Sequence, residues 1–468
     1  MTSKTSVSFL IALTVLAGCA PEPANHPANV VVILSDDQGY ADVGVHGSKD
    51  IPTPHIDSIA RNGVRFSNGY ASAPQCAPSR AGLLTGRYQN RFGFEENVYA
   101  TDGGLPAEEI TFGDRMRAAG RVTGFIGKWH LGGQYYNHPL ERGFDETFGF
   151  LGALSSYLPP VGQSSIPNLT RGRDPVVVTD YLTRAFGREA TAFIDRHQNQ
   201  PFFLLLAFNA PHEPVQASQE YLDRFAQIGN PTRRAYAAMV AALDDAVGEV
   251  LDKIAACGLE DRTLIFFLSD NGGPLGATWN GASNEPLQGA KGNVLEGGIR
   301  VPFLVQWKGR LPAGSVYEDP VIALDLLPTA LAAAGVEARP EWKLDGVNLL
   351  PYLEGRRTTP PHDVLFWRFI FRPPPLSRRN WAIREGDWKL VNTKVRLPGK
   401  QRAWRSVSKL INLRVDPHED HDLSDVEPER AKALAARWAA WDAELMLPGQ
   451  SAGKRRSAGG GAPVPARP

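Results

Sequence analysis

The sequence predicts an α/β fold. A large, mixed and mostly parallel sheet is sandwiched by helices, and a smaller C-terminal subdomain follows with a short antiparallel sheet and one helix. Short runs rich in Val, Ile, Leu and Phe alternate with segments of helical periodicity. The runs are apolar on both faces, as in central parallel strands that helices cover on each side. After about residue 340 the runs become shorter and richer in tryptophan, which indicates a separate antiparallel sheet.

Each element can be assigned in order along the chain. Four apolar runs are expected as strands of the large sheet: residues 29–35, 121–127, 201–208 and 263–269. Five stretches are expected as its helices: residues 56–62, 79–84, 112–119, 181–196 and 232–256. The C-terminal subdomain is expected to hold extended runs at 364–371 and 381–391. A helix is expected at 427–445, where Leu434, Trp438, Trp441 and Leu445 recur at helical spacing.

These assignments divide the chain into five parts. They are a signal peptide (1–18), a tether (19–27), a large domain that would carry the site (28–340), a C-terminal subdomain (341–448) and a tail expected to be disordered (449–468).

The N-terminus has the pattern of an export signal. Lys4 precedes a short apolar run at 7–17, which is too short to span a bilayer as a mature helix. The Leu-Ala-Gly sequence before Cys19 resembles a bacterial lipobox, which implies cleavage before Cys19 and lipid attachment to its sulfur. We therefore expect an exported bacterial lipoprotein, periplasmic or at the cell surface, held to the membrane by a lipid anchor. A plain cleaved secretory peptide is the alternative.

The composition excludes some classes of partner. Basic and acidic residues number 50 each, so the net charge gives no indication of a nucleic-acid-binding protein. A preference for an anionic substrate must come from a local cluster. Beyond Cys19 the chain has only Cys76 and Cys257, which do not suggest a disulfide framework. We interpret Cys257, at the expected end of a helix, as a packed thiol.

Polar side chains follow each of the four expected central strands. In chain order they are Asp36 and Asp37, then Lys128 and His130, then His212, then Asp270 and Asn271. Because ligand sites in open parallel sheets lie beyond the carboxyl ends of the strands, we expect these residues to meet in one cleft. Ordinary turns after strands are the alternative reading of each cluster.

The chemistry of these side chains indicates a metal and an oxyanion. The acidic and amide residues offer only oxygen ligands, which suit Ca²⁺, and less well Mg²⁺, rather than zinc. Lys128, His130 and His212 supply positive charge and hydrogen-bond donors. A metal with basic groups suits a tetrahedral oxyanion such as sulfate or phosphate.

Cys76 stands where a helix is expected to begin. Pro78 and Ser79 are typical helix-start residues, so Cys76 would lie at the positive end of a helix dipole, with Arg80 as a fixed cation nearby. This arrangement predicts an activated nucleophile. A buried structural thiol is the alternative.

The segment CAPSRAGLLTGR at 76–87 resembles the type I, formylglycine-dependent sulfatases of the alkaline phosphatase superfamily. It matches their pattern C-x-P-S-R-x-x-x-L-T-G-R at every defined position. Further matches are DDQGY at 36–40, GRVTGFIGKWHLG at 120–132, APHEP at 210–214, SDNGG at 269–273, GAKGNVLEGGIRVP at 289–302 and LINLRVDPHEDHDLSD at 410–425. The resemblance covers roughly residues 28 to 445 in the family's order, which makes it highly specific.

The resemblance implies a role for each matched residue. A maturase would oxidise Cys76 to formylglycine, and Arg80 would hold its surroundings. Lys128 and His130 would orient and polarise the formylglycine. Lys128, His212 and Lys291 would bind the sulfate, with His212 or Lys291 protonating the departing alcohol. Ca²⁺ would be bound by Asp36, Asp37, Asp270, Asn271 and the modified Cys76. Ser156, or Ser155 beside it, is matched to a further substrate-binding serine of the family.

The expected function is hydrolysis of sulfate esters, with a sulfated oligo- or polysaccharide as substrate. One alternative is a phosphodiesterase or phosphonate monoester hydrolase, since relatives with the same nucleophile cleave phosphoesters. A second is a non-catalytic, surface-anchored glycan-binding lipoprotein. We favour a structural role over substrate contact for Arg368 and Arg372, which lie near the end of an expected strand.

Overall fold

The structure is a computed structural model that describes residues 28–97, 103–370, 379–396 and 404–446. The expected signal peptide, tether and tail lie outside the described residues, as do Cys19 and Arg372.

The large sheet has ten strands and is mixed, as predicted. In spatial order they are β11 (Ser315–Tyr317), β2 (Val64–Phe66), β10 (Phe303–Gln306), β9 (Thr263–Ser269), β1 (Asn29–Ser35), β8 (Phe202–Ala207), β4 (Val122–Lys128), β5 (Glu146–Phe150), β6 (Thr170–Arg171) and β7 (Asp174–Pro175). The five strands from β9 to β5 are parallel, whereas β10 pairs antiparallel with both of its neighbours. The carboxyl ends of the central strands therefore lie at one edge.

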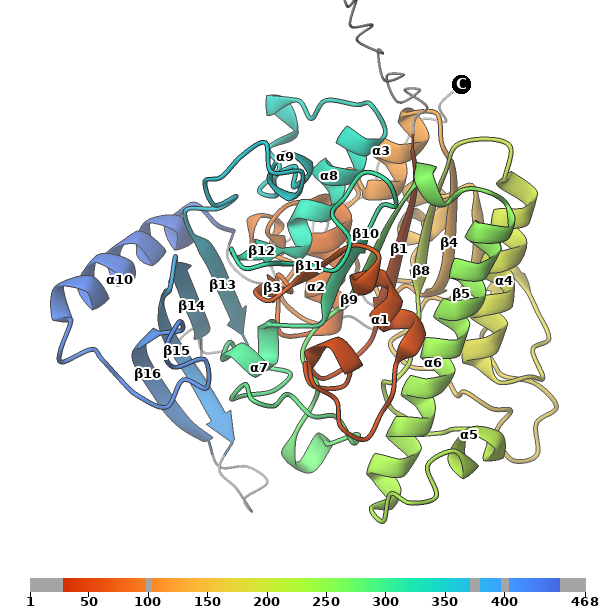
Figure 1. The fold of residues 1–468 in the computed structure, drawn as a ribbon, viewed down its shortest axis with the longest axis horizontal. Helices are drawn as coiled ribbons and strands as arrows, with labels where there is room; N and C mark the ends of the chain where they lie inside the picture. The colour runs from red at the N-terminus through yellow and green to blue at the C-terminus, as the bar shows by residue number, and fades with distance from the viewer. Residues whose placement is uncertain (1–27, 98–102, 371–378, 397–403, 447–468) are drawn as a thin grey trace, which may run out of the picture.

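Helices cover both faces of this sheet (Figure 1). One face is packed by α1 (Pro54–Arg61), α4 (Leu182–His197) and α6 (Pro231–Ala256), and the other by α2 (Cys76–Thr85), α3 (Phe112–Ala118) and α8 (Leu326–Ala333). Alternate residues of β1 enter the two cores, with Val31 and Ile33 on one side and Val30 and Val32 on the other. This explains why the central runs are apolar on both faces.

The C-terminal part is a four-stranded antiparallel sheet with one helix. The strands are β13 (Leu365–Ile370), β14 (Arg379–Glu385), β15 (Trp388–Arg396) and β16 (Trp404–Asn412), and the helix is α10 (Pro428–Ala443). Trp438 of α10 stacks on Trp381 with ring centroids 4.5 Å apart, and Trp441 stacks on Phe366 at 4.8 Å. The tryptophans that recur at the predicted helical spacing therefore form the packed face of this helix.

One expected run is two strands. Residues 381–391 divide into parts of β14 and β15, because Gly386 and Asp387 form a two-residue turn between the paired residues Glu385 and Trp388. Gly386 has a φ of 56°, which glycine adopts without steric cost.

Several short elements were not predicted. They are β2, β5, β6, β7, β10, β11, the pair β3 (Gly69–Tyr70) and β12 (Val321–Ile322), and the helices α5 (Gln219–Asp223), α7 (Glu296–Ile299), α8 and α9 (Leu350–Leu353). Among the described residues, no helix has both the length and the apolar character needed to cross a membrane.

Candidate active site

The carboxyl ends of the central strands bring the predicted polar residues to one edge of the sheet. Main-chain pairing continues beyond the strands: Asp270 N–H donates to the Ser35 carbonyl at 3.0 Å, and Asp36 N–H donates to the Ala210 carbonyl at 3.0 Å. The loops after β9, β1 and β8 are therefore held side by side. Asp37, in the loop after β1, and His130, in the loop after β4, have left-handed φ angles of 62° and 59°. Non-glycine residues adopt this conformation rarely, and such strain is concentrated at functional sites.

A buried network of carboxylates and cations fills the centre of this edge. Arg80 of α2 donates through Nε to Asp270 at 2.9 Å, and its Nη2 lies 3.4 Å from Asp36. Its Nη1 donates to the Lys128 carbonyl at 2.7 Å, and Lys128 Nζ in turn donates to Asp36. All four side chains are at most 3% exposed. Charges this deeply buried are tolerated only when they are paired and hydrogen-bonded.

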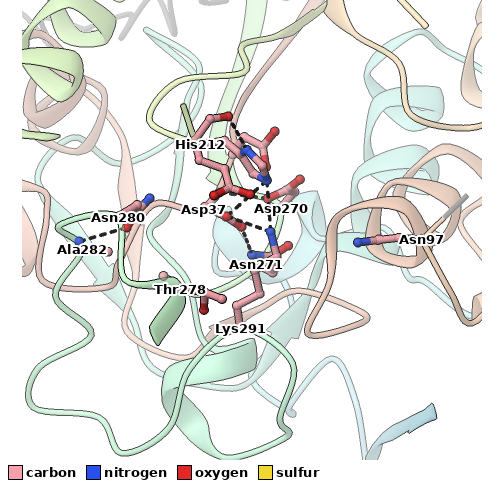
Figure 2. A network of polar contacts seen from close by, with 12 residues as sticks. Asp37, Asn97, His212, Asp270, Asn271, Thr278, Asn280, Ala282 and Lys291 are labelled. Atoms are coloured by element: carbon pink, nitrogen blue, oxygen red, sulfur yellow. Dashed lines mark hydrogen bonds and ion pairs between the residues drawn. The ribbon is translucent and has the colours of Figure 1, made fainter. Parts of the chain in front are cut away.

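A second cluster is centred on Asp37 (Figure 2). Asn271 Nδ2 donates to Asp37 Oδ1 at 2.7 Å, and Lys291 Nζ donates to Asp37 Oδ2 at 2.7 Å. Lys291 Nζ also lies 3.2 Å from His212 Nε2, while His212 Nδ1 lies 2.8 Å from the Glu213 carbonyl. These contacts assign a neutral imidazole to His212, which donates through Nδ1 and accepts from Lys291 at Nε2.

The pKa values in this site are shifted in opposite directions. Burial acts to raise the pKa of Asp36, but Lys128 and the other cations outweigh it and hold that pKa well below its usual range. Burial, together with repulsion from Asp36, raises the pKa of Asp270 to about 7. Burial lowers the pKa of His212. It also acts to lower the pKa of Lys291, but the nearby carboxylates outweigh it and raise that pKa well above its usual value. Lys291 therefore carries the proton that His212 lacks.

Cys76 is the first residue of α2 and lies beside this network. It is 1% exposed, and burial raises the pKa of its thiol to about 12. Burial therefore opposes the thiolate that the helix start and Arg80 were expected to favour, and the role of Cys76 as the nucleophile stays a prediction. Sγ marks where an oxygen on Cβ would lie if this side chain were converted.

Oxygen atoms without a partner indicate that a cation fits here. Among the described residues, the buried atoms Asp36 Oδ1 and Asn271 Oδ1 have no hydrogen-bond partner. Potential ligand atoms of Asp36, Asp37, Cys76 and His212 all lie within 4.8 Å of one another. The carboxylate oxygens of Asp36 and Asp37 and the unpartnered amide oxygen of Asn271 are donors that a hard divalent cation prefers. Asp36, Asp37 and Asn271 of the predicted set therefore suit Ca²⁺ or Mg²⁺. Asp270 is not in the group of four and instead pairs with Arg80, whereas His212, which was not predicted as a ligand, is in that group.

Three predicted residues stand apart from these contacts. His130 is buried, neither of its ring nitrogens has a partner among the described residues, and burial lowers its pKa well below the usual value. Ser155 Oγ donates to the carbonyl of Ser156 at 3.3 Å, and both serines line a cavity together with Glu213. Neither serine is hydrogen-bonded to the carboxylates or cations of the two clusters.

Sequence reasoning missed a residue beside Cys76. The side-chain oxygen of Asn97 accepts a hydrogen bond from Ala77 N–H at 3.2 Å, so this exposed amide caps the first turn of α2. Figure 2 shows Asn97 to one side of the carboxylate network. No motif or periodicity marks this residue in the sequence.

A second set of missed residues anchors the loop that carries Lys291. Glu296 begins α7, directly after that loop, and Lys389 Nζ of β15 lies 2.8 Å from its carboxylate and 2.9 Å from that of Glu419. Glu419 also accepts from Glu296 N–H at 2.7 Å. All three side chains have 0% exposure. We call Glu296, Lys389 and Glu419 the buried clamp. Both glutamates stand in segments that the sequence singled out, but nothing there indicated that they meet.

Arg368 has the structural role favoured from the sequence. It is buried, its guanidinium pairs with Glu95, and Nη1 donates to Asp442 of α10 at 2.7 Å. This residue fastens the C-terminal helix rather than lining the site.

Comparison with known proteins gives consistent matches. The family model described as Sulfatase matches residues 28–336, and the model described as N-sulphoglucosamine sulphohydrolase, C-terminal, matches residues 290–437. The chain is 36% identical over 377 residues to human N-acetylgalactosamine-6-sulfatase, covering 75% of this chain and 70% of the relative. It is 34% identical over 472 residues to arylsulfatase A of Bos taurus, covering 91% and 89%. The crystal structure of Ps i-CgsB in complex with k-i-k-neocarrahexaose superposes with a TM-score of 0.82 at 35% identity, covering 92% of this chain and 96% of that chain.

Proposed function

Because this chain belongs to the sulfatase family, whose members are sulfuric ester hydrolases, we propose that it hydrolyses the sulfate esters of a sulfated saccharide, using a formylglycine formed from Cys76. The observation that carries the proposal is the buried meeting of Asp36, Asp37 and Asp270 with the cations Arg80, Lys128 and Lys291 around position 76. Such a socket offers a hard-metal site and positive charge to one tetrahedral anion.

The saccharide part of the proposal is supported by the relatives. One relative is an N-acetylgalactosamine-6-sulfatase, and Ps i-CgsB was solved in complex with a neocarrahexaose. Both names refer to carbohydrates, and the second protein covers nearly the whole of this chain. We therefore infer a carbohydrate sulfate as the substrate class.

Different residues of the chain would serve different roles in sulfate ester hydrolysis. A cation held by the carboxylates and Asn271 would neutralise charge on the sulfate oxygens, which is Lewis-acid stabilisation. A formylglycine formed at position 76 would, when hydrated, supply the nucleophilic hydroxyl, and the start of α2 places position 76 beside the carboxylates and cations of the site. The ammonium groups of Lys128 and Lys291 are already fixed by ion pairs, so they can stabilise developing charge with little reorganisation.

The proton for the departing alcohol is supplied by the Lys291–His212 pair. Lys291 is protonated and donates to His212 Nε2, so the pair holds one transferable proton at the mouth of the Asp37 cluster. Tyr157 OH donates to the His212 carbonyl at 2.8 Å and keeps that loop in place.

The test compares hydrolysis of two ester classes by protein produced together with a formylglycine-generating maturase. We expect kcat/KM for 4-nitrophenyl sulfate to exceed that for bis(4-nitrophenyl) phosphate and for an aryl phosphonate monoester by roughly a hundredfold or more. The reverse order would identify a phosphoester hydrolase. Failure to release sulfate from any ester, with position 76 converted, would indicate a non-catalytic binding protein. Cys76→Ala is the inactive control.

We further propose export and lipid attachment at Cys19, supported by the sequence pattern of residues 1–19. Labelling with a fatty acid in a bacterial host should mark the wild type, whereas Cys19→Ala should remain unlabelled and leave the membrane fraction. Equal labelling of both would contradict this assignment.

A further inference from the structure

The cavity lined by Ser155, Ser156 and Glu213 includes the residue that directly follows His212. Its volume is about 520 Å³, inside the range of roughly 300–1,000 Å³ that small-molecule sites occupy. Two loops form its walls, and the described lining residues are Leu154, Ser155, Ser156, Pro167, Asn168, Glu213 and Pro214.

Tyr157 joins the two loops. Its hydroxyl donates to the carbonyls of Asn209 and His212, and its N–H donates to Gln216 Oε1 at 3.0 Å. The ring is fully buried and stacks on Tyr181 with centroids 5.9 Å apart. The cavity is therefore held at a fixed position relative to the sulfate-binding pair of His212 and Lys291.

Glu213 gives this cavity its charge. It is the only ionisable residue among the described lining residues, and it is exposed. Its carboxylate makes no hydrogen bond or ion pair with any residue that the structure describes. Glu213 directly follows His212 in the chain, and an unpaired carboxylate beside this loop is free to bind a ligand rather than to support the fold.

On the basis of the sulfatase function proposed above, we propose that this cavity receives the sugar ring that carries the scissile sulfate. Glu213 accepts hydrogen bonds from free hydroxyl groups of that ring, and the same carboxylate excludes a second sulfate from the neighbouring carbon.

Two physical arguments support this assignment. Hydroxyl groups that donate to a carboxylate form charge-assisted hydrogen bonds, which are stronger than neutral ones, and serine hydroxyls beside Glu213 extend the polar surface. A second sulfate at this place would meet an anion without a cation among the described lining residues, whereas the first sulfate meets Lys128 and Lys291. Like charges so placed disfavour the wrong ligand more than they change affinity for the right one.

The experiment measures kcat/KM of wild type and Glu213→Gln on three probes. They are 4-nitrophenyl sulfate, the best substrate from a panel of monosulfated galactose and N-acetylgalactosamine isomers, and the same sugar with a second sulfate on an adjacent carbon. The ratio of sugar sulfate to aryl sulfate should fall about tenfold in the variant, because charge-assisted hydrogen bonds are lost. The ratio of disulfated to monosulfated sugar should rise about tenfold, because repulsion is relieved.

Glu337→Gln is the matched control. Glu337 is exposed and follows α8, whose residue Ala333 accepts from Ala28 at the amino end of β1, so it lies at the opposite edge of the sheet. This control should leave both ratios unchanged. If Glu213→Gln also leaves either ratio unchanged, or if the wild type cleaves 4-nitrophenyl sulfate but no monosulfated sugar, the sugar-site assignment is overturned while the sulfatase function stands. Failure of the wild type on every sulfate ester would instead refute the function itself.

Discussion

Lys389→Met removes the only cation of the buried clamp and should destabilise the fold strongly. In the wild type, Lys389 Nζ lies 2.8 Å and 2.9 Å from two carboxylates that have 0% exposure. Breaking a buried pair from one side typically costs about 3–5 kcal/mol, because the remaining charge is left uncompensated. Glu296 retains Tyr70 OH at 2.6 Å, so most of the penalty falls on Glu419.

The size of this loss in the free energy of unfolding should depend on pH. Burial raises the pKa of Glu419 to about 7, although Lys389 acts to lower it. Without Lys389 the folded pKa rises further above the ordinary value of 4.5. A carboxyl with a raised folded pKa favours folding below its unfolded pKa, and that contribution is lost as pH rises through the folded pKa. The wild type completes this loss near pH 7, whereas the variant continues to lose up to about 1.4 kcal/mol per pH unit above it. We therefore expect a deficit of about 3 kcal/mol at pH 8 that narrows towards pH 6.

Urea unfolding followed by tryptophan fluorescence measures this deficit, since Trp367, Trp381 and Trp438 lie in the same core. Adding Glu419→Gln to Lys389→Met should recover most of the loss, and Lys394→Met, on a partly exposed lysine of the same strand, should cost little. A deficit below about 1 kcal/mol at pH 8, or one that does not vary with pH, would refute this reasoning.

Three further predictions concern the metal, the general acid and the buried carboxyl group of Asp244 in the large domain. Chelation with EDTA should abolish turnover and lower the midpoint of thermal unfolding, because a bound metal ion stabilises the folded state. Added Ca²⁺ should restore turnover and midpoint better than Mg²⁺ does. An unchanged midpoint would argue against a resident metal. Lys291→Ala should lower kcat/KM roughly a hundredfold or more on a sugar sulfate and less on 4-nitrophenyl sulfate, whose leaving group needs no proton, and an equal loss on both would remove Lys291 from the acid role. Burial raises the pKa of Asp244 from 3.8 to about 6, so its contribution to stability is present below 3.8 and is lost as pH rises to 6. In the wild type Ile56 N–H donates to Asp244 Oδ1 at 2.7 Å, and Asp244→Asn keeps an acceptor for it. In this variant the midpoint of thermal unfolding should vary less between pH 3.8 and pH 6 than in the wild type. The same pH profile in both proteins would contradict the raised pKa.

The central strands could be predicted because each is long enough for its burial on both faces to appear as a continuous apolar run. Residues 29–35 and 263–269 are buried at every position and were assigned with their observed limits. The edge strands β6 and β7 have two residues each, too few to show a period of two. α8 is almost entirely buried and includes Pro328, so it shows neither an amphipathic pattern nor a typical interior.

Site residues that directly follow a central strand could be predicted from the sequence, whereas those on distant loops could not. Asp36, Asp270 and His212 follow parallel strands, and the rule for open sheets brings such residues together. Lys291 follows no strand of that set and was found only through the family resemblance. Its loop is fixed by distant contacts, with Lys291 N–H donating to the Gly273 carbonyl and Gly292 N–H to the Pro74 carbonyl. Such long-range contacts leave no periodic trace in a sequence.

The state of Cys76 shows where local reasoning was incomplete. A helix start with a nearby arginine indicated an activated thiol, but only the packed structure shows how completely the thiol is desolvated. The resemblance to formylglycine enzymes is consistent with this burial, because in those enzymes the sulfur atom is not the nucleophile.

The most direct test follows the activity of preparations in which different fractions of Cys76 have been converted. Peptide mass spectrometry gives the fraction of position 76 that has lost its thiol for an aldehyde, and sulfate release from 4-nitrophenyl sulfate gives the rate. The rate should be proportional to the converted fraction and should extrapolate to zero for unconverted protein. A substantial rate from protein that retains the thiol, or no rate from fully converted protein with Ca²⁺ present, would contradict a sulfate socket built around a modified residue 76.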